Sequence, residues 1–191
     1  MAALTLGLIV TFTGYGSYSA FTATTSNTGN TLAAGTVAIA DNDGAGTLVT
    51  LSNAKPGSTD TGCITVTYTG SLAANVSLYM SSLTGTGLGP YVTLTVTRGS
   101  FSPSAPAFRS CTNFVADGTN YIGAGNGVIY NGNLSAFPTT YANGLEPTTG
   151  SPATWNNPDS HVYKFTVTVQ DNNSAQGLTA TAGFTWEARN T

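Results

Sequence analysis

Hydrophobic and polar residues alternate at the start of the chain, over Leu4–Thr13. Large apolar residues occupy every second position, with mostly threonine or glycine between them: Leu4, Leu6, Leu8, Val10 and Phe12. A period of two is typical of a β-strand with one apolar face. A strand at a chain end is stable only when a sheet receives it, and that sheet can belong to its own domain or to a neighbouring copy. The pattern therefore predicts a donor strand, which makes the chain a polymer subunit if the acceptor is a neighbour.

The same segment also fits a second interpretation, a secretory signal peptide. Its apolar residues form a hydrophobic core, and the small residues Ser17 and Ser19 follow where a signal peptidase could cut. On the other hand, no Lys or Arg precedes the apolar run, and the threonines within it are unusual for such a core. The retained strand is the favoured interpretation, and the signal peptide stays open as the alternative.

The chain is expected to divide into two parts. Residues 1–19 form the donor strand, or the remnant of a signal peptide, and residues 20–191 form one domain of a length that is ordinary for a β-sandwich. Gly14 and Gly16 lie between the donor strand and the domain. Because glycine tolerates many backbone conformations, these two residues would supply a hinge.

Seven further segments alternate like strands, and none shows a comparable helical period. They are Thr36–Ala40, Thr47–Leu51, Cys63–Tyr68, Val76–Met80, Val92–Thr97, His161–Val169 and Ala180–Trp186. Turn-forming clusters separate them, as in Asp41-Asn42-Asp43-Gly44. Short strands at such spacing indicate an all-β fold, here a jelly-roll-like antiparallel β-sandwich. In His161–Val169, the alternate positions Tyr163, Phe165, Val167 and Val169 are expected to face the core.

The alternation weakens between Arg98 and Ser160, where prolines and glycine-rich stretches become frequent. This composition predicts long loop insertions, which in compact domains are usually functional or wrapped along the body. Within them, Val128–Asn131 is a possible strand and Ser135–Asn143 a possible short helix.

Charged residues make up only 7% of the chain, against about 25% in typical soluble proteins. Five basic residues and a net charge of −3 are too few to neutralise many phosphates, so nucleic-acid binding is not expected. A surface this poor in charge has little repulsion between copies, which favours lateral association. No segment after the first approaches about 20 apolar residues, so no membrane span is expected in the mature form.

The two cysteines, Cys63 and Cys111, fit one disulfide in an oxidising compartment, although two buried thiols in a cytosolic protein are the alternative. A disulfide favours a secreted protein at the cell surface or outside the cell. Three Asn-X-Ser sequons, at Asn75, Asn133 and Asn172, would matter only in a host that glycosylates them.

Catalytic constellations are not evident. His161 is the only histidine and no Gly-X-Ser-X-Gly elbow occurs, so the sequence predicts no enzyme and no cofactor. Asp41 and Asp43 carry closely spaced oxygen ligands and are weak candidates for a calcium site, but they lack the distal glutamate of a calcium loop. Plain hairpin turns explain them more simply. Aromatic residues on strands could form a platform for a sugar, although strand aromatics more often belong to a core: Tyr79, Tyr91, Trp155, Tyr163 and Trp186.

Four motifs in order resemble the TasA/camelysin family of secreted biofilm-matrix and surface proteins. They are Gly16-Ser17-Tyr18-Ser19-Ala20-Phe21, Thr28-Gly29-Asn30-Thr31-Leu32-Ala33-Ala34-Gly35-Thr36-Val37, Leu51-Ser52-Asn53-Ala54-Lys55-Pro56-Gly57 and Thr69-Gly70-Ser71-Leu72-Ala73. The resemblance covers roughly residues 16 to 80, with a looser echo in Phe165–Gln170 and Phe184–Ala188.

This resemblance implies a jelly-roll subunit that polymerises by donor-strand exchange, its N-terminal segment completing the sheet of the next subunit. In the family, the signal peptide ends just before the Ala-Phe start, here before Ala20, whereas the best strand of this chain lies upstream at Leu4–Phe12. The metalloprotease activity described for the camelysin branch is not expected, because the ligands for it are missing.

Three functions follow as hypotheses. The favoured one is a structural subunit of an extracellular filament, a pilus or biofilm-matrix fibre, whose partners are neighbouring copies of itself. The second is a monomeric secreted surface module that binds carbohydrate or calcium. The third is a secreted hydrolase with a site that the sequence does not reveal.

Overall fold

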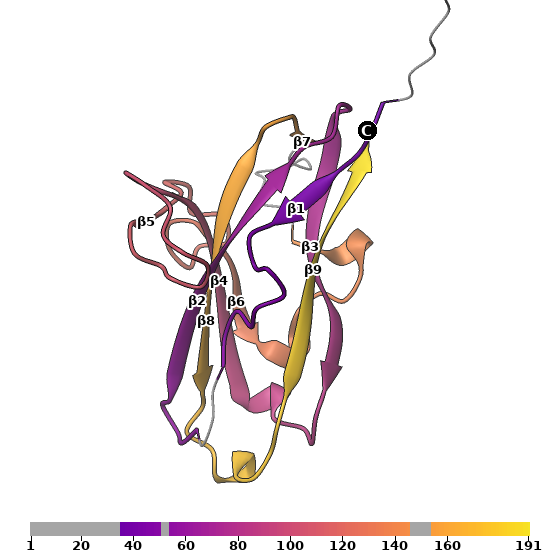
Figure 1. Ribbon diagram of the computed structural model, residues 1–191. Coiled ribbons are helices and arrows are strands. Elements are labelled where there is room, and N and C mark those ends of the chain that lie inside the picture. Colours follow the sequence, from indigo (N-terminus) through magenta and orange to yellow (C-terminus); the bar gives the residue numbers. More distant parts are fainter. Residues whose placement is uncertain (1–34, 51–53, 146–153) are drawn as a thin grey trace, which may run out of the picture. The chain divides into compact units, whose positions relative to one another are not determined.

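A computed structural model describes residues 35–50, 54–145 and 154–191, which form two antiparallel sheets packed as a sandwich (Figure 1). The sequence-predicted donor strand, the hinge glycines and the boundary after residue 19 lie outside these residues. The all-β expectation is confirmed, because the helical elements of the described chain are short 3₁₀ turns of three residues.

Nine strands and four 3₁₀ turns make up the described chain. In chain order they are β1 (Ile39–Asp41), β2 (Thr59–Tyr68), β3 (Ala74–Thr84), η1 (Gly89–Tyr91), β4 (Val92–Phe101), β5 (Phe114–Ala116), β6 (Val128–Asn133), η2 (Leu134–Ala136), η3 (Tyr141–Asn143), β7 (Thr154–Trp155), β8 (Ser160–Val169), η4 (Asn173–Ala175) and β9 (Thr181–Asn190). The larger sheet has the order β1-β2-β8-β4, and both β5 and β6 pair with the far edge of β4. The smaller sheet has the order β7-β3-β9.

Two local predictions were wrong. Residues 47–50 of the predicted strand Thr47–Leu51 are not in a strand. The backbone N–H of Thr50 and the carbonyl of Leu48 are bonded to the side chains of Asp60 and Arg109 instead of to a strand. The predicted helix over Ser135–Asn143 is instead two separate 3₁₀ turns, η2 and η3. The possible strand Val128–Asn131 is confirmed as part of β6.

The core lies between the sheets and follows the period of two. Tyr163, Phe165 and Val167 of β8 are at most 7% exposed and belong to the core cluster, and Val169 is buried beside them. The positions predicted from the alternation in β8 are therefore confirmed as buried.

Hydroxyl groups pair across the outer face of the larger sheet. Thr59 lies 2.9 Å from Thr168, Thr61 lies 3.2 Å from Thr166, and Thr67 lies 2.9 Å from Ser160, each measured between side-chain oxygens. Such cross-strand pairs stabilise a sheet without charge. Five threonines of this charge-poor sequence are placed in such pairs.

Cys63 of β2 and Cys111 of the loop between β4 and β5 form a disulfide, as predicted, with their Cα atoms 5.2 Å apart. The bond is compatible with an oxidising, extracellular compartment. Within the described residues, none of the helical turns has the length needed to cross a membrane.

Replacing both cysteines with serine should lower the free energy of unfolding by about 4 kcal/mol, because the disulfide closes a loop with a sequence separation of 48 residues and so restricts the unfolded chain. Urea unfolding of the variant and of the oxidised parent measures this difference. An unchanged midpoint would contradict the prediction.

Candidate functional site

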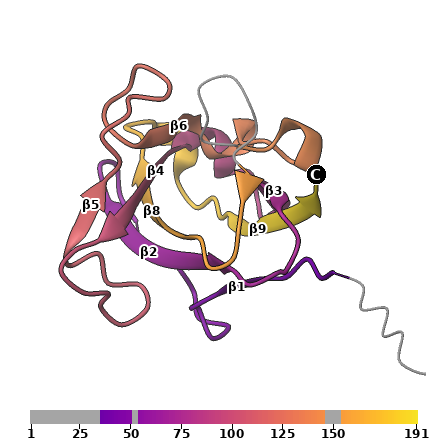
Figure 2. The same cartoon turned by 90° about the horizontal axis from the view of Figure 1, so that it is seen from above.

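The smaller sheet ends at β9 with an edge that has no partner among the described residues. β3 pairs with the other edge of β9 over nearly its whole length, from Ala74 opposite Asn190 to Thr84 opposite Thr181. On the open side, β9 faces β1 of the larger sheet across the sandwich (Figure 2). An unpaired strand edge presents a row of backbone donors and acceptors, which is a template for another strand.

The core is covered along β3 but not along β9. Val76, Leu78 and Met80 of β3 are at most 3% exposed, whereas their partners in register, Ala188, Trp186 and Phe184, are only partly buried. These β9 side chains pack against the core cluster but stay partly exposed. Among the described residues, the hydrophobic core is therefore less fully buried along β9 than along β3.

Two hollows follow the free side of β9 and together form a groove, which we call the β9 groove. The first, of about 270 Å³, is lined by β1, Val66, Phe184 and Trp186. The second, of about 390 Å³, is lined by residues from the 47–50 segment, both sheets and η2: Val49, Leu88, Val92, Leu134, Val167 and Ala182. Because Phe184 lines both hollows, the groove runs along β9. The second hollow is mainly apolar, whereas the first also has polar lining residues, Asp41 and Thr185. One wall of the groove has a β-strand edge.

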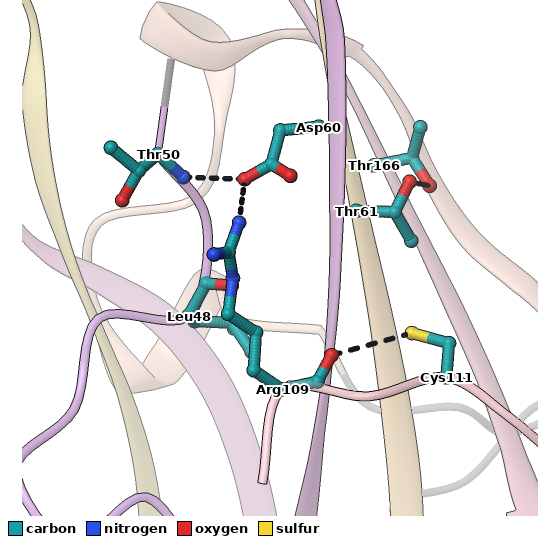
Figure 3. Close-up of polar contacts among 7 residues, drawn as sticks. All are labelled: Leu48, Thr50, Asp60, Thr61, Arg109, Cys111 and Thr166. Atoms are coloured by element: carbon teal, nitrogen blue, oxygen red, sulfur yellow. Dashed lines mark hydrogen bonds and ion pairs between the residues drawn. The ribbon is translucent and has the colours of Figure 1, made fainter. Parts of the chain in front are cut away.

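The wall opposite β9 is held by an ion pair. Arg109 forms an ion pair with Asp60 of β2, and its Nε donates a hydrogen bond of 3.0 Å to the carbonyl of Leu48 (Figure 3). The backbone N–H of Thr50 donates to the same carboxylate of Asp60 at 2.6 Å. Residues 48–50, which contribute to the groove lining, are thus fixed to β2 through one arginine and one aspartate.

The disulfide holds Arg109 in place for this contact. Arg109 lies two residues before Cys111, and its backbone exchanges two hydrogen bonds with Cys63, of 3.1 and 3.2 Å. Its φ of 73° lies in the left-handed region, which is costly for a residue with a side chain and persists only when the surroundings fix it. Gly62 leaves room for the wall, since a Cβ there would lie 2.0 Å from the carbonyl oxygen of Leu48.

Asp41 and Asp43, the weak metal candidates, act on their own backbone. Oδ1 of Asp41 accepts a hydrogen bond of 3.1 Å from the N–H of Asp43, and Oδ1 of Asp43 accepts one of 2.7 Å from Ala45. Among the described residues, no group of three or more His, Cys, Asp or Glu could hold a metal ion. These bonds are those of an Asx turn.

The aromatic residues do not form one platform. Trp155 and Tyr163 are at most 2% exposed, Tyr79 donates a hydrogen bond of 2.9 Å to Glu187, and Trp186 lies in the β9 groove. No signal in the sequence separates Phe184 and Trp186 from ordinary core residues, because alternation does not reveal which strand lacks a neighbour. Their partial exposure is the feature that marks the groove.

His161 packs against the edge of Trp155, with ring centroids 4.5 Å apart, and lies near the ion pair of Arg98 and Asp117. Burial is the main cause that lowers the pKa of His161 below its ordinary 6.5; the charge of Arg98 lowers it further, and the carboxylates of Asp117 and Asp159 oppose the shift. A neutral, half-buried imidazole here serves packing.

No known family model matches this chain, and no curated protein is significantly similar to it.

We expect the backbone N–H groups on the free edge of β9 to exchange with deuterium faster than those bonded to β3 when residues 20–191 are studied as a monomer. The reason is that only one edge of β9 has hydrogen-bond partners among the described residues. Hydrogen exchange resolved by residue measures this, and uniform protection along β9 would show that its edge is covered.

Lowering the pH should destabilise the fold through His161. Its pKa is lower in the folded state than in the unfolded state, so the unfolded chain binds the proton first, and stability present above pH 6.5 is lost as the pH falls through the folded-state pKa. The variant His161→Gln should lose less stability than the parent between about pH 7.5 and 5.5. Urea unfolding at both pH values tests this, and equal losses would contradict it.

Proposed function

We propose that the protein is a structural subunit of an extracellular filament that polymerises head to tail by donor-strand exchange. The β9 groove is the acceptor, and Leu4–Phe12 of a neighbouring copy is the donor. The observation that carries the proposal is that Phe184 and Trp186 are only partly buried, beside an edge of β9 that no described strand pairs with. A fourth strand of the smaller sheet would cover both features at once.

Donor and acceptor match in length and in chemistry. Nine residues, 4–12, span about 30 Å in a strand, and the ten residues of β9 span about 33 Å. The donor has an apolar residue at each even position, so one face of the strand can lie against the apolar side chains of the groove. The donor has no charged side chain, so its insertion buries none.

Burial of the five apolar donor side chains would contribute about 10 kcal/mol before ordering costs, at ~1.5–3 kcal/mol for each. Backbone hydrogen bonds to β9 would add to this and fix the register. A slip by one residue would turn Leu4, Leu6, Leu8, Val10 and Phe12 away from the groove, so the register is strongly specified.

The connection between donor and body favours exchange between copies. Residues 13–34 are 22 residues that can span up to about 75 Å, more than twice the length of β9, and Gly14 and Gly16 give it a hinge. An interface that joins the start of one subunit to the groove of the next does not close on itself, so it generates a filament. Insertion into the chain's own groove would give a monomer. The experiment must distinguish this intramolecular insertion from exchange between copies.

The ordered motifs that resemble the TasA/camelysin family agree with this function. The proposal also includes the jelly-roll connectivity that the sequence predicts for the sandwich. The disulfide and the low content of charged residues suit a secreted fibre. A pilus or a biofilm-matrix fibre would both use this subunit.

Val10→Lys should abolish fibres, because it places a charge on the donor face that enters the groove. Thr11→Lys is the matched control: it carries the same charge at the next position, on the opposite face of the strand, and should still assemble. Electron microscopy and sedimentation of the two variants measure the difference. Equal assembly of both variants would contradict the proposal.

Removal of residues 1–19 should leave a folded monomer that no longer polymerises, as circular dichroism and light scattering can show. A synthetic peptide of residues 1–16 should then bind this monomer and change the fluorescence of Trp186. Fibres from the truncated protein would contradict the proposal. A native protein whose mass shows that it starts at Ala20 would identify residues 1–19 as a signal peptide and favour the binding-module hypothesis.

A further inference from the structure

The described chain starts and ends at one end of the sandwich. The N–H of Thr36 donates to Ser71 Oγ at 2.8 Å, the carbonyl of Thr36 accepts from the N–H of Leu72 at 3.1 Å, and the N–H of Thr191 donates to the carbonyl of Ala73 at 3.4 Å. Figure 1 shows the beginning of the described chain beside the C-terminal end of β9. The described chain therefore begins, at residue 35, at the end of the sandwich where β9 ends.

The opposite end of the sandwich, where β9 begins, is the wide end of the groove. There the N–H of Thr86 donates to the carbonyl of Thr179 at 3.0 Å, and a hollow of about 620 Å³ lies between Pro56, Val169 and the 175–180 turn. Leu88 and Ala180 line both this hollow and the neighbouring hollow of the β9 groove, so the two are continuous.

We propose, resting on the function proposed above, that the donor strand enters the neighbour at this wide end and lies antiparallel to β9. A head-to-tail stack brings the end from which one subunit's linker leaves to the wide end of the next. Phe12, next to the linker, then lies at the entrance near Thr181, and the donor extends along the groove until Leu4 lies near Asn190. Insertion into the chain's own groove by the shortest path would give the reverse direction, parallel to β9.

Two features agree with the antiparallel direction. Every strand pair of the described chain is antiparallel, and antiparallel ladders are slightly more stable per residue than parallel ones. The alignment that sets Phe12 opposite Ala182 also sets Leu8 opposite Trp186. The apolar face of the donor and the partly buried face of β9 then coincide, and residues 14–18 pass over the hollow at the wide end.

Pairs of introduced cysteines test the direction, since the native cysteines are both in the disulfide. Thr13 and Thr5 lie near the two ends of the donor on its polar face, and the exposed Thr181 and Arg189 lie near the two ends of β9. Thr181 and Arg189 are about 27 Å apart along the strand, at about 3.4 Å per residue, too far for one cysteine to reach both.

The matched variants are Thr13→Cys with Thr181→Cys, and Thr5→Cys with Arg189→Cys. The swapped variants are Thr13→Cys with Arg189→Cys, and Thr5→Cys with Thr181→Cys.

Each variant is first shown to form fibres and is then oxidised mildly and separated on a non-reducing gel. The matched pairs should convert most of the monomer band into a ladder of covalent oligomers, and the swapped pairs should leave it as monomer. A ladder from the swapped pairs alone would overturn the antiparallel direction and leave donor-strand exchange standing. Fibres without a ladder from any pair would overturn both the direction and the β9 site. Cross-linked monomers without fibres, or no fibres from the parent protein, would overturn the proposed function itself.

Discussion

The structure depends on an unequal division of strands between two sheets. The larger sheet places β2, β8 and β4 side by side, so its central strands have partners on both edges, whereas the smaller sheet has β3 alone in its centre. A sandwich core is covered only where both sheets extend over it. Within the described residues the smaller sheet ends at β9, so the core is buried along β3, whereas Phe184 and Trp186 of β9 are only partly buried.

The surroundings of the groove are built to keep it open and in shape. The disulfide between Cys63 and Cys111 fixes the loop that carries Arg109, and Arg109 with Asp60 fixes residues 48–50 at the groove's wall. An ion pair that is partly exposed contributes little stability by itself. Its effect here is geometric, since it joins Arg109 to two segments about 50 and 60 residues earlier in the chain.

The charge-poor composition has a structural counterpart. Threonine hydroxyls pair across β2 and β8 on the outer face of the larger sheet, so these hydroxyl groups are satisfied without ions. Each arginine of the described chain is neutralised in an ion pair: Arg98 with Asp117, Arg109 with Asp60 and Arg189 with Glu187. A subunit with such a surface has little electrostatic repulsion toward its own copies, which agrees with a function in an assembly.

The all-β class, the inward positions of β8 and the pairing of the two cysteines could be predicted from the sequence, because alternation and cysteine number depend on local chemistry. The apolar alternation of Leu4–Phe12 likewise follows from the residues alone. The sequence could not show that residues 47–50 would be a wall instead of a strand, since that depends on the side chains of Asp60 and Arg109, which bind the backbone of this segment. Nor could it distinguish β9 from β8, whose apolar alternation is similar, because the exposure of a strand is set by the strands beside it. The residues thus determined which face of each strand is apolar, and only the tertiary structure decided that, within its described part, the apolar face of β9 stays partly exposed.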